Sequence, residues 1–325
     1  MKNITKERNK VIDILKGIAV ISVLLGHAIQ RGLGMNGYDP FNNYLFKIIY
    51  TYHMPLFMML SGYVLANHTK KYDLKLFFKK VRRLLYPTIL WSFLIWGVRK
   101  FNFVGIKEFI FFPDSLIEYT KTFFYHPDII IWFLYVVFIF DIWFIIQKKI
   151  NKKNDIYIDV MLSILFYLLL NLFYSTNFGI NKLHAYFPIF AFGYYLKKDY
   201  IKKLSWKYIL SSLIIYLLLL YKYPDSFLSI NPVYYLISFT AIILIHQIVI
   251  RIKNFKICNI LTFFGKYSLE IYLCQCICLN IGIGTGYLRV LTIFISATSI
   301  SVILSILANK ITPLKLILFG KLKKE

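Results

Sequence analysis

The stretch that decides the fold spans residues 11–31 and reads V-I-D-I-L-K-G-I-A-V-I-S-V-L-L-G-H-A-I-Q-R. Its length suits a membrane-spanning helix, because the hydrocarbon core of a bilayer takes about 20 predominantly apolar residues. The stretch carries Asp13, Lys16 and His27 and lacks a small-residue cleavage site, unlike a removable signal peptide. We therefore expect it to remain in the protein as the first transmembrane helix.

The rest of the chain has the same apolar character. Of its 325 residues, 58% are hydrophobic and 17% are charged, whereas soluble domains average about 45–50% apolar and about 25% charged residues. The hydropathy predicts spans near residues 11–31, 44–66, 84–104, 129–147, 157–175, 183–196, 206–221, 230–250, 264–283 and 290–309. We expect an all-α integral membrane protein, a bundle of about ten transmembrane helices that forms a single domain over residues 1–325.

The distribution of Lys and Arg predicts the orientation of these spans. Alternating loops place 29 of the 39 basic residues on one side of the membrane and 8 on the other, with Lys16 and Lys47 left over. Because cytoplasmic loops hold the basic excess, both termini are predicted to be cytoplasmic, in a multi-pass protein of the cell inner membrane. The net charge of +24 then follows from topology. We expect a lipid bilayer as its partner and no nucleic acid.

Three ionisable side chains of the first span share one face. At about 100° per residue, Lys16 and His27 lie about 20° apart around the helix, and Asp13 lies within about 60° of both. His53, in the second span, reaches a comparable depth if the two spans are antiparallel neighbours. Pro55 removes a backbone hydrogen bond nearby, which favours a kink and a cavity. A lone His is as readily a packing residue, but ionisable groups in a membrane are costly, so this cluster predicts a functional site.

Further polar residues are candidates for donor or substrate binding. Arg82 and Arg83 open the third span in F-F-K-K-V-R-R-L-L-Y-P, where they can clamp the phosphates of a nucleotide donor or bind lipid phosphates. Glu270 in the ninth span lies at about the depth of Lys16, so an ion pair between them would offset the cost of burying both, in a structural or a site role. Ser61 lies on the expected path of the donor. The sequence predicts no metal site and no serine-hydrolase motif.

These residues and their order resemble the membrane acyltransferase-3 family, particularly its fucose 4-O-acetylase-like branch. The resemblance covers nearly the whole chain and rests on Asp13, Lys16-Gly17, Gly26-His27, His53-Met54-Pro55-Leu56-Phe57, Ser61-Gly62, Arg82-Arg83-Leu84-Leu85-Tyr86-Pro87, Trp132-Phe133-Leu134, Phe187-Pro188, Gly193 and the run from Gly265 to Leu273. It implies ten helices, cytoplasmic termini and transfer of an acyl group, usually acetyl from acetyl-CoA, to a hydroxyl of a cell-surface glycan. Lys16 and His27 stand where the family has its reactive Arg and His, and Gln275 stands where its ninth-span motif commonly ends in His.

The residues support the same chemistry. An acyl thioester is already activated, so attack by a sugar hydroxyl mainly needs a base with a pKa near neutral, which imidazole supplies at about 6.5. We predict His27 as the general base, with His53 orienting it, relaying a proton or polarising the carbonyl. The resemblance implies acetyl-CoA as the donor substrate, no permanently bound cofactor, and a cell-surface or lipid-linked glycan as the acceptor. The alternatives are a transporter or flippase of a surface polysaccharide and a non-catalytic scaffold or sensor.

Overall fold

The computed structural model describes residues 9–34, 37–68, 71–100, 115–126, 131–196, 204–228, 231–279 and 281–322. Over these ranges the chain is helical and contains no β-strand, which confirms the predicted all-α fold. The first half holds α1 (Lys10–Gly34), η1 (Pro40–Asn42), α2 (Tyr44–His68), α3 (Leu74–Lys80), the π-helical η2 (Val81–Leu85), α4 (Tyr86–Lys100), α5 (Leu116–Tyr125) and α6 (Trp132–Ile150). The second half holds α7 (Ile156–Leu172), η3 (Asn177–Gly179), α8 (Ile180–Tyr195), α9 (Trp206–Lys222), η5 (Ser226–Leu228), α10 (Pro232–Ile252), α11 (Ile257–Lys266), α12 (Ser268–Cys278), α13 (Gly286–Lys310) and α14 (Thr312–Phe319).

Four of the described helices are long and apolar enough to cross a membrane: α1, α2, α10 and α13. A helix rises about 1.5 Å per residue, so the 25 residues of α1 exceed a hydrocarbon core of about 30 Å. The protein is therefore a multi-pass membrane protein. Helices also form in the other predicted spans, but their described parts are shorter or, in α6, more charged. Parts of the predicted spans, at 101–104, 129–130, 230 and 280, and the basic residues before position 9 lie outside the described residues.

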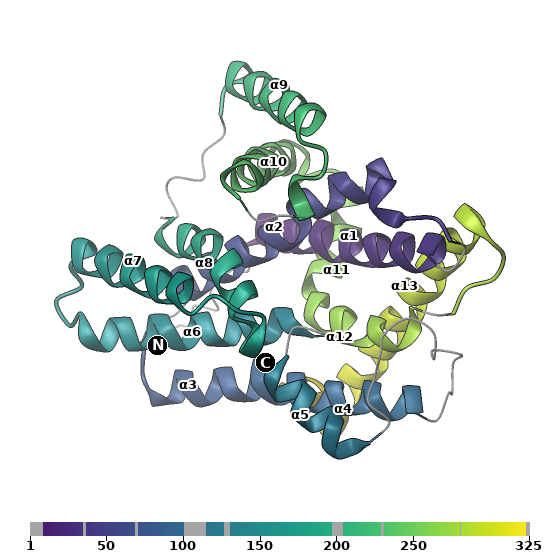
Figure 1. Cartoon of the computed structure of the whole chain (residues 1–325), viewed down its shortest axis with the longest axis horizontal. Helices are drawn as coiled ribbons and strands as arrows, with labels where there is room; N and C mark the ends of the chain where they lie inside the picture. The colour runs from purple at the N-terminus through teal and green to yellow at the C-terminus, as the bar shows by residue number, and fades with distance from the viewer. Residues whose placement is uncertain are drawn as a thin grey trace.

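Helix α1 is the centre of the bundle. It packs against α2, α10, α11, α12 and α13, and Figure 1 shows it in the middle of the molecule. We call the two ends of the bundle the Lys10 end and the Gly34 end, after the first and last residues of α1. Two glycines bring α1 and α11 into close approach: a methyl group on Gly17 would overlap the Leu261 carbonyl, and one on Gly265 would overlap the Asp13 carbonyl. Small residues at such crossings let membrane helices approach closely.

Helices α2 and α8 cross in the same way, through a reciprocal pair of glycines. A methyl group on Gly62 of α2 would overlap the Phe190 carbonyl of α8, and one on Gly193 of α8 would overlap the Met59 carbonyl of α2. Each glycine thus accommodates the backbone of the other helix. The crossing fixes the position of α2, which carries two predicted site residues.

Pro55 lies inside α2 without ending it. A proline cannot donate the helical hydrogen bond to the carbonyl four residues earlier, which here belongs to Thr51. The Ser238 hydroxyl of α10 donates to that carbonyl at 2.7 Å. A neighbouring helix therefore satisfies the freed group, as the low-dielectric membrane interior requires.

The ninth predicted span is two helices rather than one. Helix α11 ends at Lys266 and α12 begins at Ser268, with Tyr267 between them at φ −103° and ψ 13°. These angles lie outside the α-helical region. The break follows directly after Gly265, where the chain is held against α1.

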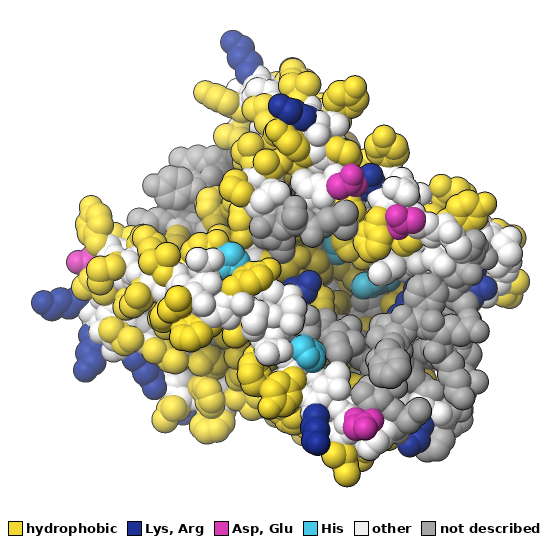
Figure 2. All heavy atoms as spheres, viewed as in Figure 1, with side chains coloured by type: hydrophobic (Ala, Val, Ile, Leu, Met, Phe, Trp, Pro, Cys, Tyr) yellow, Lys and Arg dark blue, Asp and Glu magenta, His cyan; other side chains and the backbone are white. Residues whose placement is uncertain are grey.

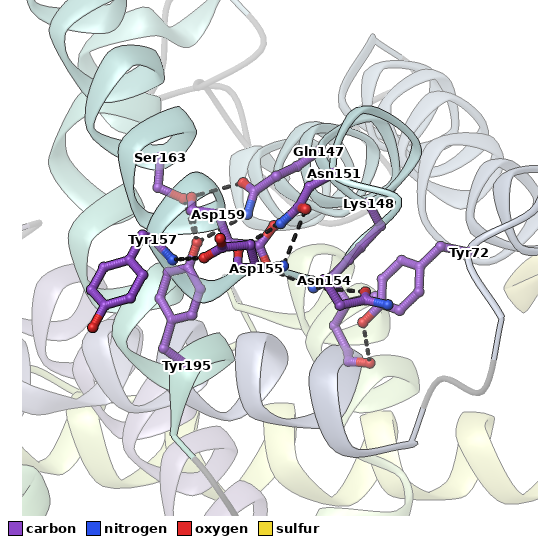
Figure 3. A network of polar contacts seen from close by, with 11 residues as sticks. Tyr72, Gln147, Lys148, Asn151, Asn154, Asp155, Tyr157, Asp159, Ser163 and Tyr195 are labelled. Carbon is purple, nitrogen blue, oxygen red and sulfur yellow. Dashed lines mark hydrogen bonds and ion pairs between the residues drawn. The ribbon is translucent and has the colours of Figure 1, made fainter.

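A buried polar network ties α6, α7 and α8 together near the Lys10 end (Figure 3). Its centre is Asp159 of α7, which is 2% exposed and forms an ion pair with Lys148 of α6. Asn151 Nδ2 donates to Asp159 Oδ1 at 2.8 Å, and the Tyr195 hydroxyl of α8 donates to the Asp159 carbonyl at 2.8 Å. The Ser163 and Tyr195 hydroxyls lie 2.7 Å apart. A buried carboxylate needs such a cation and such donors, so the network fixes the three helices relative to one another.

Candidate functional site

The structure brings His27 of α1 and His53 of α2 to the same part of the helix interface. The residue before His27, Gly26, faces Ile49 and Tyr50 of α2. The Tyr50 and His53 rings meet edge to face, with 4.6 Å between their centroids, and His27 lies within electrostatic range of His53. Figure 2 shows several histidine side chains, in cyan, on the face of the molecule that it draws. The two predicted catalytic residues are therefore neighbours.

A hydrogen bond sets the tautomer of His53. Its Nδ1 lies 2.7 Å from the Ile49 carbonyl oxygen of the same helix. A carbonyl can only accept, so Nδ1 carries the hydrogen and donates it. In the neutral ring the lone pair then belongs to Nε2. Since His53 is 4% exposed, this geometry provides a buried, oriented imidazole with one basic nitrogen.

His27 is half-buried and has polar neighbours on its own helix. The Gln30 side chain hydrogen-bonds its ring, and Arg31 lies near it. Arg31 is itself buried, 9% exposed, and lies within electrostatic range of Tyr50 and of Cys276 on α12. The sequence places Arg31 at the end of the first predicted span and Tyr50 inside the second, but neither was predicted as a site residue. Each lies about one helical turn from a candidate histidine, and that spacing is a signal that could have found them.

The polar residues nearer the Lys10 end occupy α1 and the middle of α2. Asp13 is buried, 3% exposed, in the first turn of α1, and its carbonyl faces Gly265. Lys16 follows it, half-buried. The Ser61 hydroxyl donates to the Phe57 carbonyl of its own helix at 2.8 Å, and its two lone pairs can still accept from a donor. Among the described residues, no three His, Cys, Asp or Glu side chains are grouped to hold a metal ion.

Arg82 and Arg83 have a structural contact that the sequence did not predict. Arg82 Nε donates to the Gly320 carbonyl at 3.0 Å, and an Arg83 guanidinium nitrogen donates to the Phe319 carbonyl at 3.1 Å. Trp91 Nε1 donates to the Leu318 carbonyl at 2.8 Å, and its ring stacks on Phe319. The last carbonyls of a helix lack partners within it and attract cations. The arginine pair therefore binds the end of α14, whatever else it contacts.

Glu270 forms an ion pair with Lys321, a partner that the sequence did not predict. The carboxylate is 1% exposed, in the first turn of α12 after the break at Tyr267. Gly320 ends α14 in the left-handed conformation at φ 58°, and the chain then turns so that Lys321 reaches Glu270. The sequence could not predict this partner, because the depth of a residue in one span does not reveal which chain end returns to it. We refer to the segment 318–321, with its contacts to Arg82, Arg83, Trp91 and Glu270, as the C-terminal clasp.

A cavity of about 260 Å³ opens at the Lys10 end between α1, α2 and α10. Most of its lining is apolar, and it includes Leu15 and Leu60, which directly precede Lys16 and Ser61 in the sequence. His246 of α10 also lines it, and its buried Nε2 has no hydrogen-bond partner among the described residues. The cavity can accept a narrow, mainly apolar group that also offers a hydrogen-bond acceptor.

Comparison with known proteins identifies the family. The model of the acyltransferase domain family matches residues 9–310, nearly the whole chain. The chain belongs to this family. The match contains α1 to α13, with both candidate histidines, Arg82, Arg83 and Glu270, and it confirms the resemblance to the membrane acyltransferases.

Two curated relatives share part of the sequence. The nodulation protein NolL of Mesorhizobium japonicum is 31% identical over 139 residues, which cover 42% of this chain and 35% of the relative. The nodulation protein NolL of Sinorhizobium fredii is 33% identical over 103 residues, covering 30% of this chain and 28% of the relative. The chain thus spans about a third of the length of the curated relatives it matches. No solved structure matches the chain significantly.

Proposed function

We propose that this acyltransferase moves an acetyl group from acetyl-CoA to a hydroxyl of a cell-surface or lipid-linked glycan. The observation that carries the proposal is the pair of neighbouring histidines, one with its tautomer fixed by the Ile49 carbonyl, in a chain of the acyltransferase family. Transfer of an acyl group from a thioester to an alcohol needs a base and little other chemistry.

In the proposed reaction His27 removes the proton of the acceptor hydroxyl while the hydroxyl oxygen attacks the thioester carbonyl carbon. The new carbon–oxygen bond forms, the carbon–sulfur bond breaks, and the CoA thiolate leaves. The thiolate then recovers the proton from the His27 imidazolium, so the protein returns to its starting state. His53 acts from its Nε2, as a relay to His27 or as an orienting group, because its Nδ1 hydrogen is engaged by the backbone.

Contacts between helix ends support ten crossings in alternating directions, which the proposal includes. At the Gly34 end, Lys47 near the start of α2 pairs with Asp225 between α9 and α10 at 2.7 Å, and the start of α13 contacts the start of α2. At the Lys10 end, Lys10 Nζ donates to Asn259 of α11 at 3.1 Å, and the end of α2 contacts the end of α8. These pairings are the ones that ten alternating spans in a single domain over residues 1–325 require.

We propose that the Lys10 end faces the cytoplasm, since the basic excess of the chain lies in the connections at that end. Acetyl-CoA then enters from that side. The cavity beside Leu15 and Leu60 would take its pantetheine arm, and we propose Asp13, Lys16 and Ser61 as contacts of the donor between this cavity and the histidines. Arg82, Arg83 and Glu270 remain proposed donor contacts that also hold the clasp. The acceptor enters from the Gly34 end, in the inner membrane of the cell.

The test uses inside-out membrane vesicles that contain the protein, so that the cytoplasmic face of the membrane faces the solution. Radiolabelled acetyl-CoA is added outside the vesicles. Glycan-bearing membrane fragments are placed outside in one preparation and inside in another. We expect CoA release and labelled glycan when the donor is on the cytoplasmic face and the glycan is on the opposite face. Movement of glycan across the bilayer without CoA release would contradict the proposal and favour a transporter or flippase. Product only when both substrates share the cytoplasmic side would refute transfer across the bilayer.

A further inference from the structure

A polar pocket of about 280 Å³ lies at the Gly34 end, outside the site described above. It is formed by the connection between α9 and α10 and the first turn of α10, and its lining includes Lys222, Tyr223, Asp225, Ser226 and Asn231. Unlike the cavity at the Lys10 end, it is lined mainly by side chains that donate or accept hydrogen bonds. Asn231 caps α10 by accepting from the Tyr234 N–H, and Asp225 pairs with Lys47, so the sign of a ligand has to come from the other lining residues.

Ser226 is an independent sign that the pocket binds something. Its side chain is 6% exposed, and its hydroxyl has no hydrogen-bond partner among the described residues. A buried hydroxyl without a partner costs free energy, and a ligand hydroxyl in the pocket would remove that cost. The hydroxyl can both donate to and accept from such a group.

The carboxylate beside Ser226 is held in place by a buried cation. Lys47 of α2, with its side chain 10% exposed, lies 2.7 Å from Asp225, whose side chain is 57% exposed. The pair is electrically neutral, and the exposed part of the carboxylate can accept hydrogen bonds from hydroxyl groups. The Tyr223 ring, 39% exposed, adds an apolar face of the kind that packs on a sugar ring.

Aromatic rings connect this pocket to the histidine site. Phe227, which follows Ser226, lies 5.9 Å from Tyr50 between ring centroids, and Tyr50 lies 4.6 Å from His53. Phe227 also packs on Phe46 at 5.9 Å. Two ring contacts therefore separate Phe227, which follows the pocket residue Ser226, from a candidate catalytic residue, so the pocket lies close to the histidine site.

We infer that this pocket binds the acceptor, as a subsite for an uncharged pyranose ring next to the sugar that receives the acyl group. The inference rests on the proposed function, because it assigns the acceptor to one end of the same site. Ser226 and the Asp225 carboxylate form hydrogen bonds with ring hydroxyls, and Tyr223 supports the ring. These residues determine acceptor binding and take no part in the chemistry.

The experiment measures acetyl transfer from saturating acetyl-CoA to methyl disaccharides made of two uncharged pyranose rings, called uncharged pyranosides below, because they can fill the reacting position and the subsite together. The comparison acceptors, called uronosides, are the matching disaccharides in which the ring that does not react is a uronic acid. We expect the wild type to prefer an uncharged pyranoside. Ser226→Ala and Asp225→Asn should each raise the acceptor KM about tenfold, equivalent to about 1.4 kcal/mol, with kcat and the acetyl-CoA KM within about twofold. Glu118→Gln is the matched control: it removes one exposed carboxylate from α5, outside the pocket, and should change neither KM.

If Asp225→Asn perturbs folding because Lys47 loses its carboxylate partner, Ser226→Ala still tests the inference. An acceptor KM that stays within twofold of wild type in Ser226→Ala would overturn the inference, as would preference for the uronosides. Acetylation of membrane glycan without acetylation of any uncharged pyranoside would overturn it too, while leaving the proposed function intact. If the wild type releases no CoA even with membrane glycan, the proposed function itself fails.

Discussion

Replacing Gly193 by Ala should separate α8 from α2 and disturb the site on α2. A methyl group at position 193 would lie 2.8 Å from the Met59 carbonyl carbon and 2.9 Å from its Cα, and closer still to the carbonyl oxygen, whereas ordinary contact begins at 3.4 Å. These atoms belong to the backbone, so no side chain can turn away. The helices must move apart by more than about half an ångström, the shortfall at the two carbon atoms.

The free-energy cost can be bounded. Overpacking of this kind costs about 1–3 kcal/mol, while Ala in a helix gains about 0.5–1 kcal/mol over Gly. Gly97→Ala in α4 is the matched control, because a methyl group there meets nothing within 4 Å. Both variants gain the same helix propensity, so the difference in their free energies of unfolding should equal the full overpacking cost of about 1–3 kcal/mol.

The measurement is the temperature at which each purified variant, heated in detergent, loses its monodisperse size-exclusion peak. Gly193→Ala should fall below wild type and Gly97→Ala should match or exceed it. A displacement of about 1 Å can cost about 100-fold in rate, so Gly193→Ala should also lower kcat at temperatures where the protein is intact. Adding Gly62→Ala should cost less than it does alone, since the helices are already apart. Equal stability of Gly193→Ala and Gly97→Ala would refute the close crossing.

Four further predictions follow from the site and the clasp. His27→Ala should insert normally but lose acetyl transfer by about 100- to 10,000-fold, and wild-type turnover would exclude it as the base. His53→Gln should lose most of the activity, and an unchanged rate would leave it a packing residue. Lys321→Met should lower stability by about 3–5 kcal/mol by leaving a buried carboxylate unpaired, and adding Glu270→Gln should restore most of it; a double variant as unstable as the single one would contradict the pair. Arg82→Ala should raise the acetyl-CoA KM more than it lowers kcat, and it should weaken the attachment of the end of α14 to the bundle. An unchanged acetyl-CoA KM with a much lower kcat would count against a donor contact.

The membrane helices of the described chain could be predicted where the signal is local. Helix α1 follows from its apolar length, and the proximity of His27 and His53 follows from their depths in two antiparallel neighbours. The break at Tyr267 was missed because apolar residues continue on both sides of it. It depends on the contact of Gly265 with α1, which only the packed bundle supplies.

Contacts between residues far apart in the chain could not be predicted from the sequence, for a different reason. A guanidinium suits a phosphate and a helix terminus equally, so the type of residue at 82 and 83 cannot distinguish a donor contact from the end of α14. Likewise, Glu270 needed a cation, but several lysines of the predicted cytoplasmic side could have supplied it. The choice of Lys321 depends on the turn at Gly320, where the backbone is left-handed.

The C-terminal clasp also constrains the order in which the protein can assemble. Synthesis proceeds from the N-terminus, so α12 emerges before Lys321 exists. Until the chain has been made through residue 321, Glu270 has to stay hydrated or carry a proton. The first turn of α12 therefore cannot reach its buried position in the bundle before that point. Closure of the C-terminal clasp is therefore a late event, after all the longer helices have been made. A ribosome that stops short of this segment leaves a chain with every long helix present and an acidic group unsatisfied at its core.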